Sequence, residues 1–173
     1  MTQFYSHRRL AENTYIEIEG IDFEDFEVGQ IFEHRPGRTF TAEENRIHAF
    51  RSLDQTVRHV DTVYNEKVYG KEQVISEALV LSVVTALTTK TFGKVVANLG
   101  WTNIRLPTLV YAGDTIYAES EILGKRESQS RPTQGIMHVR TRAVNQRGEE
   151  VCSFERRFLV YKRNQGPYQA AGY

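Results

Sequence analysis

Asp54 and His59, an aspartate and a histidine five positions apart, are the residues in this chain best suited to chemistry. They follow a segment that predicts a helix end, where both side chains can be aimed at one point. A carboxylate has a low intrinsic pKa and an imidazole titrates near neutrality, so together they can hold a water molecule and move its protons. This chemistry would add water to a substrate or remove it. In the alternative interpretation, Asp54 caps a turn and His59 is an ordinary surface histidine.

The elements that position this pair begin with a short helix. Thr41 and Glu44 form the capping-box pattern, in which a hydroxyl and a carboxylate satisfy the first amides of a helix. Residues 45–53 are then expected to be helical and to deliver Asp54 at the helix exit. Residues 57–65 are expected to form a loop and a short turn. The chemistry is therefore predicted to sit on loop ends against a rigid scaffold.

A second helix is expected over about residues 76–91, and it is apolar on nearly all sides. It is too short and too interrupted by Ser and Thr to span a bilayer, which takes about 20 apolar residues, so it should lie inside the domain. Strand-like patterns cover residues 30–40, 95–106, 115–123, 136–145 and 150–161. The predicted fold class is α+β, with one antiparallel sheet curled around one buried helix.

The chain resembles the MaoC-like hydratases and (R)-specific enoyl-CoA hydratases of the hot-dog fold. The resemblance covers Phe23 to about Arg163 and includes the Asp-x4-His spacing of Asp54 and His59. It is also carried by the runs FEDFEVGQ at 23–30, NLGW at 98–101, RLP at 105–107 and GDT at 113–115. The runs KRESQSRP at 125–132 and NQRGE at 145–149 are most similar to the branch that includes mesaconyl-CoA hydratases and methylmalyl-CoA dehydratases.

The resemblance implies reversible addition of water across the 2,3 double bond of an enoyl-CoA, with either a linear or a short branched or carboxylated acyl group. Asp54 and His59 would be the acid and the base, and their assignment stays open. Charge develops on the thioester oxygen, so the backbone amides of Ser76 and Glu77 at the start of the second helix are expected to stabilise it. Coenzyme A belongs to the substrate, and no separate cofactor is expected.

Glu77 departs from the usual family pattern, in which a His-Gly pair opens this helix. Counting from Asp54 places Ser76 and Glu77 at that pair. A carboxylate beside an enolate would repel it, so Glu77 must point away or bind something, or the site accepts a different acyl group. The alternative is a first-turn acid that interacts favourably with the helix dipole. Thr85 matches a position where some members place a serine that steadies the aspartate; alternatively, it bonds its own backbone.

Three cations, Lys125, Arg126 and Arg131, fall in a stretch that is predicted to be a hairpin loop. They are candidates for contacts with the phosphates of coenzyme A, because cationic side chains recognise phosphate through charge-assisted hydrogen bonds. A solvated loop or a subunit contact explains them equally well. Trp101, the only tryptophan, is expected in core or interface packing.

Composition limits the remaining possibilities. The chain has 22 Lys and Arg against 22 Asp and Glu, so its net charge of +0 predicts no nucleic acid and no membrane as partners. The acyl-CoA partner is implied by the resemblance. One hot-dog domain is expected over 23–163, between an N-terminal arm, 1–22, and a C-terminal tail, 164–173. The single cysteine and the spacing of the histidines predict no disulfide and no metal. With no leader segment apparent, the expected location is the cytoplasm.

Other outcomes remain open at this level. An open curled sheet leaves edges and a face to cover, so a homodimer or a multiple of dimers is expected. A hot-dog acyl-CoA thioesterase would place its carboxylate on the central helix, where Glu77 is the only acid. A non-catalytic acyl-binding subunit would complete the active site of another chain, but the presence of both Asp54 and His59 argues against it.

Overall fold

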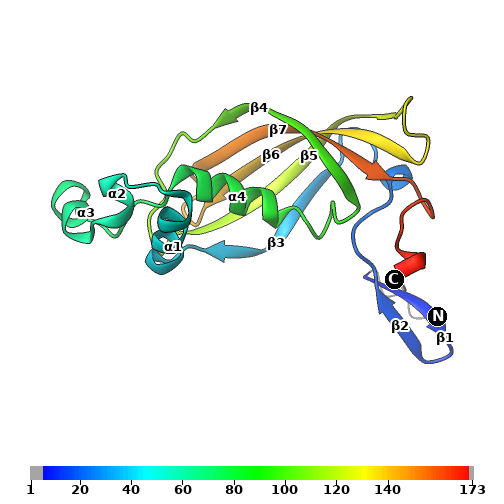
Figure 1. The fold of residues 1–173 in the computed structure, drawn as a ribbon, viewed down its shortest axis with the longest axis horizontal. Coiled ribbons are helices and arrows are strands. Elements are labelled where there is room, and N and C mark those ends of the chain that lie inside the picture. The colour runs from blue at the N-terminus through cyan, green and yellow to red at the C-terminus, as the bar shows by residue number, and fades with distance from the viewer. Residues whose placement is uncertain (1–5, 172–173) are drawn as a thin grey trace.

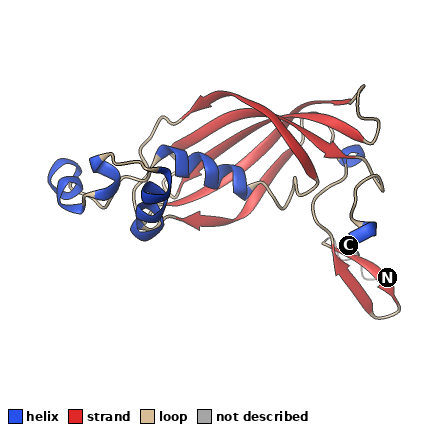
Figure 2. Ribbon diagram, in the orientation of Figure 1, coloured by secondary structure: helices blue, strands red, loops and turns tan. Residues whose placement is uncertain are grey.

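The protein has an α+β fold, seen here in a computed structural model that describes residues 6–171 (Figure 1). Within those residues, five antiparallel strands form the main sheet in the order β3-β5-β6-β7-β4. Strands are drawn in red in Figure 2. Their bounds are β3 Ile31–Thr39, β4 Val95–Arg105, β5 Thr115–Glu127, β6 Gln134–Asn145 and β7 Glu150–Tyr161. All five predicted strands are therefore confirmed, with β5 extending four residues beyond its predicted end.

Helix α4, Glu77–Leu87, lies across one face of this sheet and packs against β3, β6 and β7 (Figure 1). It is shorter than the predicted 76–91 because the hydroxyls of Thr88 and Thr89 bond to the carbonyl oxygens of Thr85 and Ala86. Threonines that bond to the backbone in this way compete with helix continuation. The helix is also not covered on every side, since three of its residues are exposed: Ala78, Ser82 and Ala86.

Two apolar clusters form the core. The first joins α4 to the sheet and contains residues such as Phe40, Ile75, Val80, Val84 and Phe154. The second packs the opening segment, with its short η1 helix Phe23–Asp25, against the other half of the sheet through Phe26, Phe92, Met137 and Phe158. The core thereby fixes α4 and the loops at its start relative to the sheet.

The α-helices α1, α2 and α3 precede α4 and lie beside one end of the sheet (Figure 1). Helix α1, Ala42–Ser52, begins with the predicted capping box, which is confirmed by the reciprocal bonds of Thr41 and Glu44. Leu53 ends it in a left-handed conformation, with φ of 57°. The predicted loop and short turn over 57–65 is wrong, because this stretch forms helix α2, Val57–Val60, and most of helix α3, Thr62–Tyr69.

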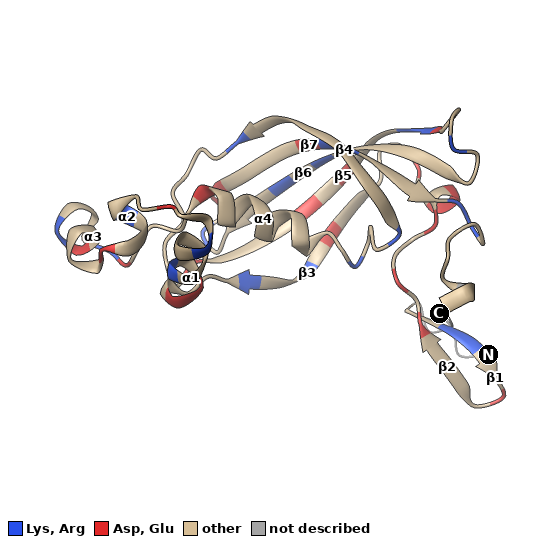
Figure 3. Ribbon diagram, viewed as in Figure 1, with Lys and Arg blue, Asp and Glu red and all other residues tan. Residues whose placement is uncertain are grey.

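The N-terminal segment forms its own hairpin, apart from the main sheet (Figure 1). Its strands are β1, His7–Ala11, and β2, Thr14–Glu17. The C-terminal segment ends with the short helix η2, Gln169–Ala171, near this hairpin. None of the helices in residues 6–171 is long and apolar enough to cross a membrane. Acidic and basic residues are interspersed along the sheet and the helices (Figure 3).

Candidate active site

The structure brings together the predicted acid/base pair and the start of α4. The Nε2 atom of His59 lies 3.8 Å from Oδ2 of Asp54 and 3.5 Å from Oε2 of Glu77. Asp54 arrives from the exit of α1, His59 from α2 and Glu77 from the first turn of α4. The His59 side chain is 3% exposed, whereas those of Asp54 and Glu77 are 26% and 35% exposed. A buried imidazole therefore meets two carboxylates that solvent can reach.

The backbone fixes the orientation of the His59 ring. Its Nδ1 atom lies 3.0 Å from the carbonyl oxygen of Val74. A carbonyl oxygen can only accept a hydrogen bond, so Nδ1 carries the proton in this arrangement. The other nitrogen, Nε2, faces Asp54. Their separation of 3.8 Å is too long for a direct hydrogen bond and suits a water molecule that contacts both groups.

Asp54 is held in its ionised form. The amide of Thr56 donates to its Oδ1 atom at 3.0 Å, and the hydroxyl of Ser76 lies 3.5 Å from its Oδ2 atom. Hydrogen bonding by Thr56 is the main cause that lowers the pKa of Asp54, and the charge of His59 and the Ser76 hydroxyl add to it. Because a carboxylate with a lowered pKa is charged at neutral pH, Asp54 can accept a proton from water.

Asn45, a residue of α1 that sequence reasoning missed, connects the parts of the site. It is fully buried, and its Nδ2 atom donates to the carbonyl oxygens of His59, at 3.1 Å, and Val74, at 3.0 Å. Its Oδ1 atom accepts the amide of Ser76 at 2.8 Å. A polar residue on the buried side of a predicted helix was the available sequence signal. Asn45 therefore sets the position of α2 relative to the start of α4.

This bond changes what the two predicted thioester-binding amides can do. The amide of Ser76 is already occupied by Asn45. The amide of Glu77 has no hydrogen-bond acceptor among residues 6–171, as is usual in the first turn of a helix. Of the two predicted donors, Glu77 is the one that can point its N–H group at a developing negative charge.

Arg58 is a second residue that sequence reasoning missed. Its Nη2 atom donates to Oε1 of Glu77 at 2.7 Å. Its side chain is 33% exposed, so the ion pair lies at the surface of the site. Glu77 thus binds a partner, which was one of the possibilities left open for it, and its other oxygen faces His59. No sequence pattern singled out Arg58, apart from its place immediately before His59.

Thr85 lies away from the acid/base pair along α4. Its hydroxyl donates to the carbonyl oxygen of Leu81 at 2.9 Å, which is the helix-backbone bond considered as the alternative for this residue. The residues bonded to Asp54 are Thr56 and Ser76 instead. Thr85 makes no hydrogen bond to Asp54, so the structure gives no support for the predicted role of Thr85 in steadying Asp54.

The three candidate phosphate contacts lie elsewhere in the chain. Lys125 and Arg126 belong to β5, not to a loop as expected, and only Arg131 lies in the loop that joins β5 to β6. Lys125 donates to the carbonyl oxygens of Phe23 and Glu24 at 3.3 and 3.1 Å. This hairpin lies at the end of the sheet away from α1, α2 and α3 (Figure 1). Within one chain, these cations are therefore not brought to Asp54 and His59.

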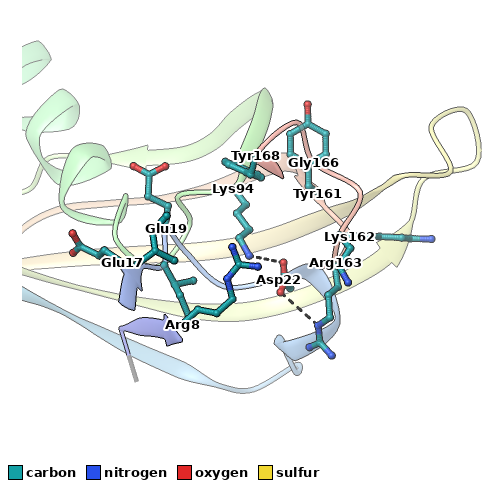
Figure 4. A pocket seen from close by; sticks show the side chains of 13 residues that line it. Arg8, Glu17, Glu19, Asp22, Lys94, Tyr161, Lys162, Arg163, Gly166 and Tyr168 are labelled. Atoms are coloured by element: carbon teal, nitrogen blue, oxygen red, sulfur yellow. Dashed lines mark hydrogen bonds and ion pairs between the residues drawn. The ribbon is translucent and has the colours of Figure 1, made fainter. Parts of the chain in front are cut away.

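A cavity of about 290 Å³ lies between the N-terminal hairpin and the C-terminal segment (Figure 4). Asp22 in this cavity is bonded by Lys94 at 2.6 Å and by Arg163 at 3.5 Å. These charges compensate one another, and none of the predicted site residues lines the cavity. Residues 6–171 contain no group of three His, Cys, Asp or Glu side chains placed to hold a metal ion. The expectation that no metal is needed stays a prediction.

The fold and the site together define a class of protein. A single helix across a curled antiparallel sheet, with an Asp-x4-His pair beside the helix start, is the arrangement of a MaoC-like hot-dog domain. The chain belongs to the mesaconyl-CoA hydratase family, because the family model with that description matches residues 3–172. The family and the fold predicted from the sequence are thereby confirmed.

Similar proteins agree with this assignment. Mesaconyl-CoA hydratase from Cereibacter sphaeroides is 31% identical over 151 residues, which cover 82% of this chain and 41% of that protein. Beta-methylmalyl-CoA dehydratase from Chloroflexus aurantiacus is 29% identical over 143 residues, with coverage of 82% and 40%. A crystal structure described as a MaoC domain protein dehydratase from Chloroflexus aurantiacus has a TM-score of 0.77 at 29% identity, covering 85% of this chain and 42% of that one. The chain spans about two fifths of the length of these relatives.

Proposed function

We propose that the chain is an enoyl-CoA hydratase or dehydratase that acts on a short branched or carboxylated acyl group. The observation that carries this proposal is the gap of 3.8 Å between Nε2 of His59 and Oδ2 of Asp54, which fits one shared water molecule. Membership of the mesaconyl-CoA hydratase family supports it. The names of two relatives, a mesaconyl-CoA hydratase and a beta-methylmalyl-CoA dehydratase, favour a substrate that carries a carboxylate.

In the hydration direction, the ionised Asp54 takes a proton from water as the oxygen bonds to the β-carbon. His59 in its protonated form, with its Nδ1–H bonded to Val74, gives the proton on Nε2 to the α-carbon. The proton that Asp54 took from water then passes to Nε2, which restores both groups, and dehydration runs the same transfers in reverse. The bond of Nδ1 to Val74 keeps Nε2 as the nitrogen that exchanges protons. Negative charge on the thioester oxygen is stabilised by the amide of Glu77 and the N-terminal end of the α4 dipole. The reaction needs no group besides the substrate, and this absence of a cofactor stays a prediction.

The test follows the enoyl-thioester absorbance band of crotonyl-CoA and mesaconyl-CoA with purified protein, while a thiol reagent reports free coenzyme A. Loss of the band without thiol release is the expected result. Thiol release would instead indicate the thioesterase, for which Glu77 of the central helix is the available carboxylate. If neither signal changes while acyl-CoA still binds, the chain is an acyl-binding subunit and the proposed hydration is wrong.

We further propose that two copies of the chain associate through strand β4. This strand is an edge of the sheet, and its large apolar side chains Leu99, Trp101 and Ile104 are 52%, 37% and 44% exposed. An exposed edge with apolar side chains is suited to pairing with another strand. The length of the relatives, about twice that of this chain, is compatible with two such domains acting together.

Association would also give the basic residues of the β5–β6 hairpin a role. Lys125, Arg126 and Arg131 belong to this hairpin, which lies at the end of the sheet away from α1, α2 and α3 (Figure 1). As contacts for the phosphates of coenzyme A, they would have to act on a substrate bound mainly by a neighbouring copy. Action in the cytoplasm is likewise a prediction from the sequence.

A further inference from the structure

The carboxylate of Glu77 is held between two groups of the site. One oxygen accepts a hydrogen bond from Arg58 at 2.7 Å, and the other lies 3.5 Å from Nε2 of His59. A carboxylate of the protein itself thus occupies the space that borders the water-handling imidazole. That space has the charge and the donors to accept a carboxylate.

Arg58 has capacity for a second partner. A guanidinium carries five N–H donors in a planar fork that matches the two oxygens of a carboxylate. Within residues 6–171, the side chain of Arg58 makes a single hydrogen bond, to Glu77, and it is 33% exposed. A bidentate pair with an incoming carboxylate would use more of these donors than the resting contact does.

The position of Arg58 matches a particular class of substrate. In mesaconyl-CoA the carboxylate is attached to the β-carbon, the atom that water attacks. A receptor for that carboxylate must therefore lie directly beside the residues that handle the water. Arg58 meets this requirement, because it precedes His59 in the chain and forms an ion pair with the Glu77 carboxylate, which lies beside Nε2 of His59.

We propose that Arg58 binds a carboxylate carried on the β-carbon of the acyl thioester, and that Glu77 occupies Arg58 until this substrate arrives. The inference rests on the proposed function, since it assigns the substrate class of the same site. Glu77 lies in the first turn of α4, and its side chain is 35% exposed. It can therefore rotate outward without disturbing the helix, and its amide stays in place for the thioester.

The test measures binding, so that it does not depend on turnover. Succinyl-CoA carries a carboxylate on its β-carbon and butyryl-CoA carries a methyl group there, and neither has the double bond required for hydration. Dissociation constants for both are measured by calorimetry with wild type, Arg58→Gln and Glu77→Gln. The wild type is expected to prefer succinyl-CoA. Arg58→Gln should reduce this preference by about 10- to 100-fold, the range for a hydrogen bond to a charged group.

Glu77→Gln should move the preference in the opposite direction, because it removes the competing carboxylate and leaves Arg58 unpaired. If the ion pair of Arg58 and Glu77 were only structural, breaking it from either side would change the affinity for both ligands alike. Opposite shifts in the preference therefore support the proposal. Arg58→Lys, which keeps the charge without the fork, should fall between wild type and Arg58→Gln. This variant also serves if Arg58→Gln unfolds.

Matched controls come from the outer part of the sheet, where Arg140 and Glu121 form another exposed pair at 3.2 Å. Arg140→Gln and Glu121→Gln should leave the preference unchanged. The inference is overturned if the wild type does not prefer succinyl-CoA or if Arg58→Gln keeps the wild-type preference. Either result can be obtained while the enoyl band still disappears, so it would leave the proposed hydration intact. If hydration fails but Arg58→Gln and Glu77→Gln still shift the binding preference in opposite directions, the proposed reaction is wrong and the proposed role of Arg58 stands.

Discussion

The imidazole of His59 is fixed by the carbonyl oxygen of Val74, 3.0 Å from its Nδ1 atom. The same carbonyl accepts a hydrogen bond from Asn45, and the amide of Val74 donates to Asn65 at 3.1 Å. Val74 itself is fully buried and forms a bridge with Tyr111. A backbone group held by these bonds therefore sets which nitrogen of His59 carries the structural proton. The hydrogen bond made by one ring nitrogen of a histidine therefore determines how the other nitrogen can act on a substrate.

Asp54→Asn should reduce turnover by about 10²- to 10⁴-fold, the range that a positioned acid or base contributes. The amide side chain is nearly isosteric and keeps an oxygen for the amide of Thr56, so the melting temperature should change little. Hydration rates and thermal unfolding check both parts. Asp25→Asn is the control, since Asp25 is an exposed carboxylate of η1 with a partner of its own, Arg163. Unchanged turnover in Asp54→Asn would remove Asp54 from the mechanism.

Asn45→Ala should destabilise the fold as well as the site. The truncation leaves the carbonyl oxygens of His59 and Val74 and the amide of Ser76 without this partner in a buried region. Each orphaned buried polar group costs about 1–3 kcal/mol, although Val74 keeps its bond to His59, so a total of about 3 kcal/mol is expected. Urea unfolding measures it, with the exposed Asn13→Ala as control. A loss equal to that of the control would show that Asn45 does not hold the site together.

The parts of the fold that could be predicted from the sequence are those in which a pattern of apolar residues extends over many positions. Strands β5 and β6 alternate between buried and less buried residues over most of their length, and β4 and β7 are 11 and 12 residues long. The α4 segment is mostly apolar over its 11 residues, so these signals extend over many positions. Helix α2 has four residues, which is barely one turn, and α3 depends on a cap from Asp61. The β1–β2 hairpin is exposed on both faces, so it has no apolar alternation to reveal it.

The residues of the site could likewise be predicted only where a local pattern in the sequence marks them. Asp54, His59 and Glu77 were singled out because a local spacing and a helix start are visible in the sequence, and the structure places all three side by side. Asn45 and Arg58 act through contacts with residues 14 to 31 positions away. Those contacts exist only once α1, α2 and α4 have packed, so no local pattern could identify them.

His34 should make the fold sensitive to mild acid. It is 3% exposed and its Nε2 atom lies 2.8 Å from the Ser120 hydroxyl; burial, with the charges of Arg156 and Arg35, lowers the pKa of His34 to about 4. The unfolded chain takes up this proton near pH 6.5, while the folded protein resists it until about pH 4. Folding is therefore unaffected by this group above pH 6.5 and is progressively penalised as the pH falls from 6.5 to 4.

Between pH 7 and pH 4.5, this penalty should be on the order of 2 kcal/mol in the free energy of unfolding. His34→Gln should lose that much less stability than wild type over the same interval, although it is less stable at pH 7. Urea unfolding at both pH values gives the comparison. His7→Gln is the control, because His7 is an exposed histidine of β1. An equal loss in wild type and His34→Gln would contradict the assignment.

Strand β4 should be the place where two copies meet. Trp101 and Ile104 project exposed apolar area from an edge strand that pairs only with β7 among residues 6–171. Replacing both by Lys removes about 1.5–3 kcal/mol of burial for each side chain and adds charges at the edge, so dimer affinity should fall by more than 100-fold. Light scattering after size exclusion measures the mass. Ile31→Lys on β3, the opposite edge, is the matched control because Ile31 is 64% exposed. A wild-type monomer, or a Lys variant that stays dimeric, would rule out association through β4.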